Sequence, residues 1–131
     1  MVIRAAVTIC LTGMLAWAQG SYAAGGVCTT RSSGDITGDT PAGSSMAAGQ
    51  VFDVPCRGGI RGELQVLSGR FFDVTLQLEQ YARDGWRVVQ GGQRIAYSAM
   101  PGMYRFTVRN SASDNPQAAP AVWRLRYSLP F

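Results

Sequence analysis

Apolar and polar residues alternate with a period of two along most of the chain after Gln50. The clearest run begins at Phe72 and ends at Glu79, where four large apolar side chains (Phe72, Val74, Leu76 and Leu78) alternate with four polar ones. Successive side chains of a β-strand point to opposite faces of the sheet, so this pattern indicates a strand with one buried face. We therefore predict a core strand here.

Shorter runs with the same alternation follow and precede this strand, at residues 52–54, 64–66, 86–88, 95–97, 104–109 and 123–129. Turn-forming dipeptides separate several of them, and Asp84-Gly85 predicts a hairpin. About seven short strands with little helical periodicity are typical of an all-β sandwich. We predict a single antiparallel, jelly-roll-like β-sandwich over residues 50–131.

The segment 24–49 has a different composition from the rest of the mature chain. Glycine, serine and threonine dominate it, and these residues favour turns and loops. Asp35 and Asp39 are spaced without the alternating ligands and closing glutamate of a calcium loop, so they are interpreted as turn residues. The sequence predicts an N-terminal loop segment here.

The first 23 residues have the pattern of a secretory signal peptide. Arg4 precedes an apolar run from Ala5 to Trp17, which is too short for a membrane span, and small residues follow it. Cleavage is predicted after Ala23, with Ala18 as the second candidate. The expected location is the periplasm or the extracellular space.

Cleavage removes Cys10 and leaves Cys28 and Cys56 in a compartment that oxidises thiols. One disulfide between them is predicted, worth about 3.5 kcal/mol on the chain-entropy estimate. The alternative is a reactive cysteine, but a thiolate needs a neighbouring base, and the chain contains neither histidine nor lysine.

Composition narrows the possible chemistry. All 12 basic residues are arginine against 8 acids, and histidine is absent, which removes the commonest general base and metal ligand. Asp73 and Glu79 fall on one strand face about 20 Å apart, too far to act on one bond. We therefore predict a protein without enzymatic activity that binds no metal, cofactor or nucleic acid. The mature chain has a net charge of 11 − 8 = +3, which favours acidic partners.

Four arginines lie at outward positions of the last two predicted strands. If the strand ending at Arg109 pairs with the strand containing Arg124 in a hairpin, then Arg105, Arg109, Arg124 and Arg126 share one sheet face. Such a face suits bidentate contact with carboxylates. The alternative is a solvated face balanced by Asp73 and Glu79. Trp86 and Trp123 fit the apolar pattern and are predicted as core residues rather than sugar platforms.

The C-terminal half resembles a known family. Ala99-Met100-Pro101-Gly102-Met103-Tyr104-Arg105-Phe106-Thr107-Val108 and Trp123-Arg124-Leu125-Arg126-Tyr127-Ser128-Leu129 resemble the closing strands of the bacterial pre-peptidase C-terminal domain, and Phe71 to Leu78 resembles its central strand. The resemblance covers roughly residues 50–129 and implies a β-sandwich.

A narrower resemblance is to the periplasmic inhibitor of g-type lysozyme. Val108-Arg109-Asn110-Ser111-Ala112-Ser113 is similar to the RNxAR loop of that family, with Ser113 in place of the second arginine. The resemblance implies that Arg109 faces the acidic cleft of an enzyme and that Asn110 belongs to the same binding loop.

These observations predict a non-catalytic periplasmic or secreted binding protein. We expect an inhibitor or immunity-type protein that neutralises a cell-wall hydrolase or toxin. The alternative function is a carbohydrate-binding, adhesion or structural module of the cell envelope.

Overall fold

A computed structural model describes residues 26–112 and 120–131, and the predicted signal peptide and Ser113 lie outside the described residues. The elements are β1 (Arg31–Thr40), β2 (Ser44–Val54), β3 (Gly58–Ser68), η1 (Phe71–Asp73), β4 (Val74–Ala82), β5 (Gly85–Gly92), β6 (Arg94–Ala99), β7 (Gly102–Asn110) and β8 (Ala121–Pro130). No helix within the described ranges is long and apolar enough to cross a membrane.

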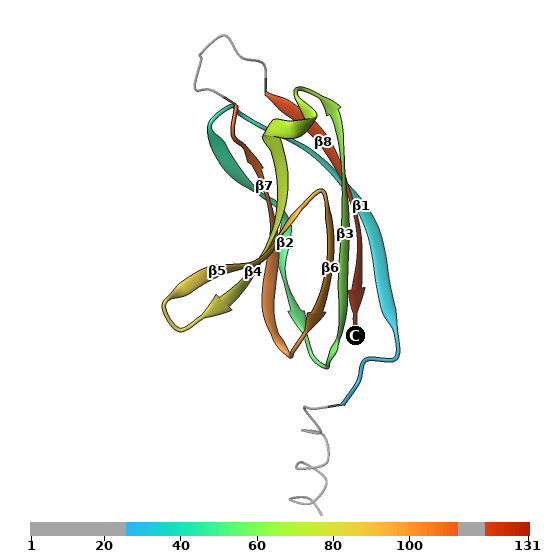
Figure 1. The fold of residues 1–131 in the computed structure, drawn as a ribbon. Helices are drawn as coiled ribbons and strands as arrows, with labels where there is room; N and C mark the ends of the chain where they lie inside the picture. The colour runs from blue at the N-terminus through green and yellow to red at the C-terminus, as the bar shows by residue number, and fades with distance from the viewer. Residues whose placement is uncertain (1–25, 113–119) are drawn as a thin grey trace, which may run out of the picture.

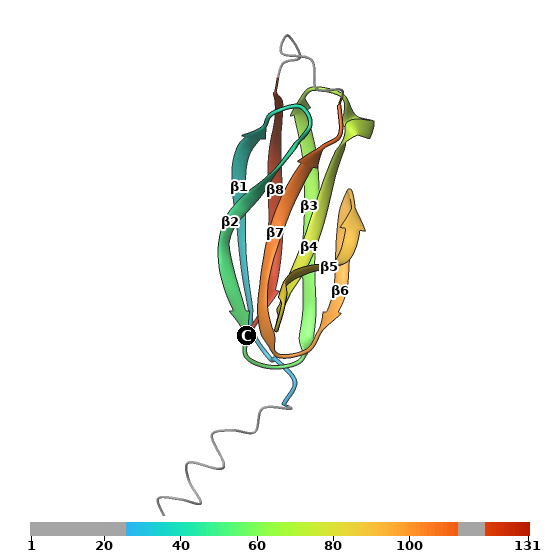
Figure 2. The same ribbon diagram turned by 90° about the vertical axis from the view of Figure 1, so that its left-hand side faces the viewer.

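The described strands form two four-stranded antiparallel sheets that pack face to face (Figure 1 and Figure 2). The first, here called the β1 sheet, has the order β1-β8-β3-β6, and the second, the β2 sheet, has the order β2-β7-β4-β5. Consecutive described strands lie in opposite sheets, except for the β4–β5 hairpin. This order is that of an eight-stranded jelly roll, and it confirms the predicted sandwich.

The core lies between the two sheets and contains residues from both. Val74, Leu76 and Leu78 are fully buried in β4, as the alternation predicted. Phe72 is an exception to that prediction, because 91% of it is exposed. The chain around it turns as η1, with the Asp73 N–H bonded to the Arg70 carbonyl, and the strand begins only at Val74.

The predicted loop over residues 24–49 is wrong, because β1 and most of β2 lie in it. The reason lies in the partners of the β1 glycines. Gly34 and Gly38 pair in register with Tyr127 and Trp123 of β8, and the aromatic rings occupy the space that a Cβ would take. A Cβ at Gly38 would lie 2.6 Å from a ring carbon of Trp123. These glycines therefore act as strand residues that admit an aromatic ring.

Buried hydrogen bonds connect the ends of β1, β7 and β8 across the sandwich. The Thr40 hydroxyl accepts from the Trp123 indole nitrogen over 3.0 Å and donates to the Val108 carbonyl oxygen. Trp123 is 2% exposed, which confirms its place in the core. A tryptophan that is buried so deeply needs an acceptor for its N–H, and Thr40 supplies one.

The predicted disulfide between Cys28 and Cys56 is confirmed, with their Cα atoms 5.2 Å apart. It joins the segment before β1 to the connection between β2 and β3. The Cys28 N–H also donates to the Arg57 carbonyl oxygen, so a hydrogen bond supports the same junction. The N-terminal end of the sandwich is thereby fixed to its body.

A side-chain amide joins the two sheets at one side of the sandwich, where β5 and β6 are the edge strands. The Gln90 Nε2 donates to the Ala96 carbonyl oxygen over 3.2 Å, and the Ala96 N–H donates to Gln90 Oε1 over 2.7 Å. Gln90 thus replaces the backbone of a neighbouring strand for one residue of β6.

Candidate functional site

The structure separates the four arginines that the sequence placed on one face. β7 pairs with β2 and β4, whereas β8 pairs with β1 and β3. Arg105 and Arg109 therefore belong to the outer face of the β2 sheet, and Arg124 and Arg126 to that of the β1 sheet. The prediction of a common face is wrong, because it assumed that strands adjacent in sequence form a hairpin.

Asn110 lies at the end of β7 and is 3% exposed. Its Nδ2 donates to the Thr40 carbonyl oxygen over 3.2 Å, and its Oδ1 accepts from the Ala112 N–H over 3.1 Å. Both ends of the amide are therefore engaged within the chain. Asn110 stabilises this end of the sandwich and offers no surface to a partner, whereas the neighbouring Arg109 is exposed.

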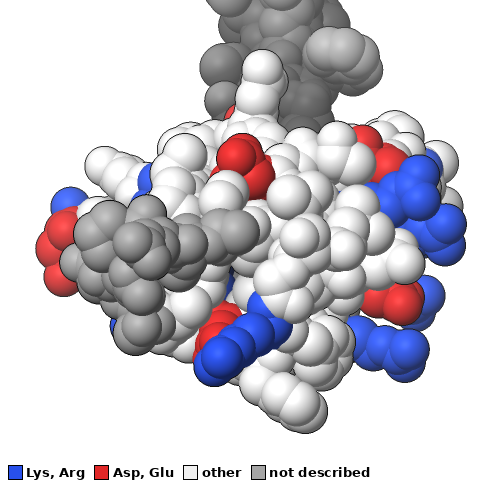
Figure 3. Space-filling view, turned by 90° about the horizontal axis from the view of Figure 1, so that it is seen from above, with Lys and Arg blue, Asp and Glu red and all other residues white. Residues whose placement is uncertain are grey.

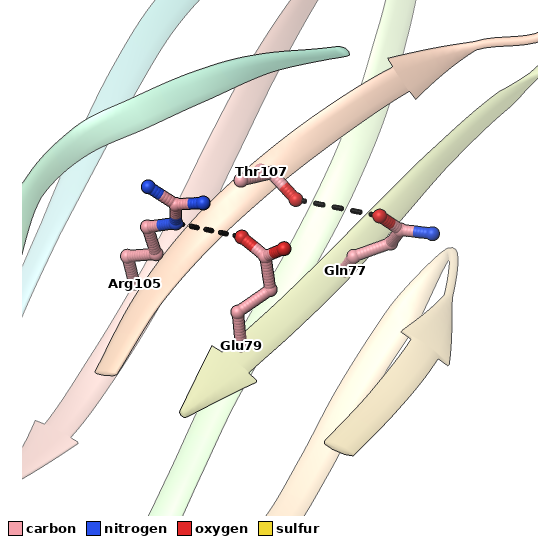
Figure 4. A network of polar contacts seen from close by, with 4 residues as sticks. All are labelled: Gln77, Glu79, Arg105 and Thr107. Atoms are coloured by element: carbon pink, nitrogen blue, oxygen red, sulfur yellow. Dashed lines mark hydrogen bonds and ion pairs between the residues drawn. The ribbon is translucent and has the colours of Figure 1, made fainter. Parts of the chain in front are cut away.

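On the outer face of the β2 sheet, Arg105 forms an ion pair with Glu79 of the adjacent β4 (Figure 4). The Nε–Oε2 distance is 2.7 Å, and 31% of the arginine and 14% of the glutamate side chain are exposed. Partial burial weakens the competition from water, so this charge-assisted hydrogen bond restricts both side chains. The predicted balance of arginine by Glu79 is confirmed for Arg105.

The same guanidinium lies over the ring of Trp86 in β5, 4.4 Å from its centroid. Tyr81 contacts Trp86 edge to face across the hairpin, with the ring centroids 5.3 Å apart. Trp86 is only partly buried and lies outside the core, so its prediction as a core residue is wrong. The period-two pattern assigned it to an apolar face, and it occupies the outer one.

We define the hairpin surface as Glu79, Tyr81, Trp86, Val88 and Arg105. Tyr81 and Val88 are about half exposed, at 50% and 47%. Beside this surface, Thr107 and Gln77 form a second cross-strand contact at 3.5 Å (Figure 4). The outer end of the β4–β5 hairpin extends away from the sandwich (Figure 1). The surface is thus held in place by side-chain contacts and accessible to a partner.

The outer face of the β1 sheet is organised by charge. One row across its four strands contains Arg94, Glu63, Arg126 and Asp35 in register. Arg94 and Glu63 approach to 3.7 Å and Arg126 and Asp35 to 3.5 Å, all four being well exposed. Seen from the end of the sandwich, basic and acidic side chains lie close together on the right-hand side of the view, the side on which β1 lies in Figure 1 (Figure 3). Arg124 lies in the next row, opposite Gln65 and Thr37.

Carboxylates do not gather at one point of the described structure. Glu63 and Glu79 belong to opposite outer faces, and each has an arginine partner. Asp73 lies in η1, outside β4. Among the described residues, no group of three or more Cys, Asp or Glu side chains has an arrangement suited to holding a metal ion.

Comparison with known proteins defines the fold and not the family. No family model and no curated protein matches the sequence. Among solved structures, the Yersinia pseudotuberculosis-derived mitogen (YPM) is similar with a TM-score of 0.55 and 14% identity, over 76% of this chain and 87% of that chain. FlhE gives a TM-score of 0.42 and 9% identity, over 79% and 100%. The resemblance to the pre-peptidase C-terminal domain and the lysozyme inhibitor stays a prediction.

Proposed function

We propose that this chain is a non-catalytic binding protein of the inhibitor or immunity type, and that it docks a protein partner through the hairpin surface. The arrangement of Trp86, placed against both Arg105 and Tyr81, carries the proposal. Tryptophan, tyrosine and arginine are the residues that contribute most of the energy of protein interfaces. The hairpin surface brings all three together at an accessible position.

The contacts within this surface favour tight binding. Ordering a long side chain on association costs about 0.5–1.5 kcal/mol. Arg105 is already held by Glu79 and Trp86, so a partner meets a guanidinium whose position is largely fixed. The free nitrogens of its fork suit a carboxylate of the partner. A convex hairpin of this kind fits a concave surface, such as the cleft of an enzyme.

We further propose that the protein acts outside the cytoplasm. The disulfide between Cys28 and Cys56 fits an oxidising compartment, and the sequence predicts a signal peptide before it. A cell-wall hydrolase is the partner that we propose for a small protein in such a compartment. The alternative position of contact is Arg109, which the resemblance to the lysozyme inhibitor implies and which lies four residues from Arg105 on the same strand.

The experiment is a turbidity assay in which the mature protein is titrated against g-type, c-type and i-type lysozymes acting on bacterial walls. We expect saturable inhibition of one class near equimolar ratio. Trp86→Ala and Arg105→Gln are expected to weaken inhibition at least tenfold. Arg109→Gln removes the same charge outside the hairpin surface and serves as the control, with inhibition unchanged within twofold.

Two outcomes contradict the proposal in different ways. Absence of inhibition with all three lysozyme classes contradicts the proposed target. Inhibition that is lost with Arg109→Gln and kept with Arg105→Gln supports the implied lysozyme-inhibitor loop and rejects the hairpin surface.

A further inference from the structure

Two adjoining depressions lie along β3 and β8 on the outer face of the β1 sheet, opposite the hairpin surface. One has a volume of about 330 Å³ and borders Arg61, Arg94 and Arg126. The other has about 480 Å³ and borders Gln65, Phe71 and Arg124. Both also border Glu63 and Arg126, so they adjoin, and we call the two together the sheet groove. Each volume is within the range of small-ligand sites.

Positive charge in the sheet groove is only partly compensated. The central row of Arg94, Glu63, Arg126 and Asp35 is neutral overall. On one side of it, Arg61 pairs in register with Ala96 and Ser128, and on the other, Arg124 pairs with Gln65 and Thr37. Neither Arg61 nor Arg124 forms an ion pair with a described residue. Each of the two depressions therefore borders one uncompensated guanidinium.

Arg124 also has an unused donor. Its Nε–H is buried and has no hydrogen-bond acceptor among the described residues. A buried donor without an acceptor is unfavourable, and this Nε lies out of reach of a ligand. The two terminal nitrogens of the same guanidinium are therefore the fork that can bind a carboxylate through two parallel hydrogen bonds.

An aromatic ring borders the same depression as Arg124. Phe71 is 50% exposed at the wall of the larger depression, and its ring is supported by Phe72 at 5.5 Å in an edge-to-face contact. The exposed ring offers a surface for the C–H face of a sugar ring, and the Gln65 amide both donates to and accepts from hydroxyl groups. The depression thus combines a carboxylate fork, an apolar wall and an amide.

We propose that the sheet groove binds an acidic glycan, with the carboxylate of one sugar on Arg124 and its ring against Phe71. A carboxylate in the groove also favours this ligand over a polymer of phosphate or sulfate groups. Glu63 in the groove, and Asp35 next to it beyond Arg126, accept hydrogen bonds from sugar hydroxyls, whereas they repel closely spaced phosphates or sulfates. An acidic glycan with hydroxyls between its carboxylates fits both kinds of group.

This inference goes beyond the proposed function and does not depend on it. The sheet groove and the hairpin surface belong to the outer faces of opposite sheets. A glycan in the groove therefore leaves the hairpin free for a protein partner.

The test is isothermal titration of the mature protein with hexagalacturonate, a hyaluronate hexamer and sialyllactose at physiological salt. We expect saturable one-to-one binding of at least one of these carboxylated glycans. Methyl esterification of the carboxylates of that glycan should weaken binding at least tenfold. Single-stranded DNA of equal charge should bind at least tenfold more weakly.

Variants locate the site. Arg124→Gln is expected to weaken binding at least tenfold, and Arg124→Lys nearly as much, because lysine keeps the charge and lacks the fork. Phe71→Ala removes an exposed ring and should weaken binding severalfold without affecting folding. Arg109→Gln removes an equal charge from the outer face of the other sheet and should leave binding unchanged.

Three results overturn the proposal. The first is the absence of binding for all three glycans, and the second is DNA binding as tight as glycan binding. The third is an equal effect of Arg124→Gln and Arg109→Gln, which would show that general electrostatic attraction and not the groove accounts for binding. Circular dichroism of each variant establishes that it is folded before the titration is interpreted.

Discussion

The guanidinium of Arg105 lies 4.4 Å from the centroid of the Trp86 ring, although the two residues belong to strands separated by β4. Arg105 reaches across that strand, where it also pairs with Glu79. A single side chain therefore connects the body of the β2 sheet to the projecting hairpin.

This contact is expected to contribute measurable stability. We expect a double-mutant cycle of Arg105→Gln and Trp86→Leu to give a coupling energy of about 0.5–1 kcal/mol in urea unfolding. The same measurement with Glu79→Gln in the Trp86→Leu background shows how much of the coupling energy depends on the ion pair. A coupling energy of zero would mean that the ring and the guanidinium are adjacent without attraction.

Two strand glycines, Gly38 of β1 and Gly59 of β3, are predicted to respond unequally to alanine. Gly38→Ala should destabilise the fold by about 1–3 kcal/mol, because its Cβ would lie 2.6 Å from the Trp123 ring. Gly59→Ala is the control, since no heavy atom lies within 4 Å of the Cβ that it adds. Thermal or urea unfolding measures both. Equal stabilities for the two variants would contradict the packing of Trp123 on Gly38.

The hydrogen bond from Trp123 to Thr40 can be tested with a substitution that keeps the shape. Thr40→Val leaves the indole N–H buried without an acceptor and should cost about 1–3 kcal/mol. Thr37→Val makes the same change at an exposed position of the same strand and should change the free energy of unfolding by less than about 0.5 kcal/mol. Similar losses in the two variants would remove the buried bond as the cause.

Removal of the disulfide is expected to cost about 2–4 kcal/mol of stability in the Cys28→Ser, Cys56→Ser double variant. Mass spectrometry after thiol alkylation should show two more labels with reductant than without it. Identical labelling under both conditions would exclude the bond.

Tyr104 predicts a loss of stability at alkaline pH. Burial, and then the neighbouring Tyr97, raise the pKa of the Tyr104 hydroxyl above its usual value. That hydroxyl donates to the Met100 carbonyl oxygen over 2.7 Å, a bond that only the neutral phenol can make. The folded state therefore favours the neutral phenol. The free energy of unfolding that comes from this preference is fully present below about pH 10, the pKa of an unfolded tyrosine. It is lost as the pH rises through the pKa of Tyr104 in the folded state.

We expect Tyr104→Phe to be about 1 kcal/mol less stable at pH 8, because it lacks this hydrogen bond. The same variant should lose less stability than the native chain between pH 8 and pH 11. Urea unfolding at the two pH values measures both effects. A parallel decline in the two proteins would assign the alkaline effect to other groups.

Local patterns predicted the strands from β3 onward, together with the disulfide, because alternation and cysteine number depend on the sequence alone. They did not predict β1, since Gly34 and Gly38 become strand residues only opposite the rings of Tyr127 and Trp123. Those partners lie about ninety residues away along the chain. The composition of the segment 24–49 gives no indication of these distant aromatic partners.

The candidate surfaces were predicted less well for a related reason. Outward positions of Arg105 and Arg124 follow from alternation, but the sheet to which each belongs follows from strand order. Sequential strands usually neighbour each other, whereas in this jelly roll most of them lie in opposite sheets. Trp86 illustrates the same limit, because alternation gives its face relative to Arg87 and does not say which face is inside.

The bridge between Gln90 and Ala96 has a consequence for behaviour at high concentration. An edge strand with free N–H and C=O groups is a template on which another polypeptide can add a strand, and this is a route to fibres and swapped dimers. Gln90 occupies both groups of Ala96 in the middle of the edge strand β6. Replacing Gln90 with alanine would free both groups of Ala96, so this one amide side chain protects the edge against strand addition.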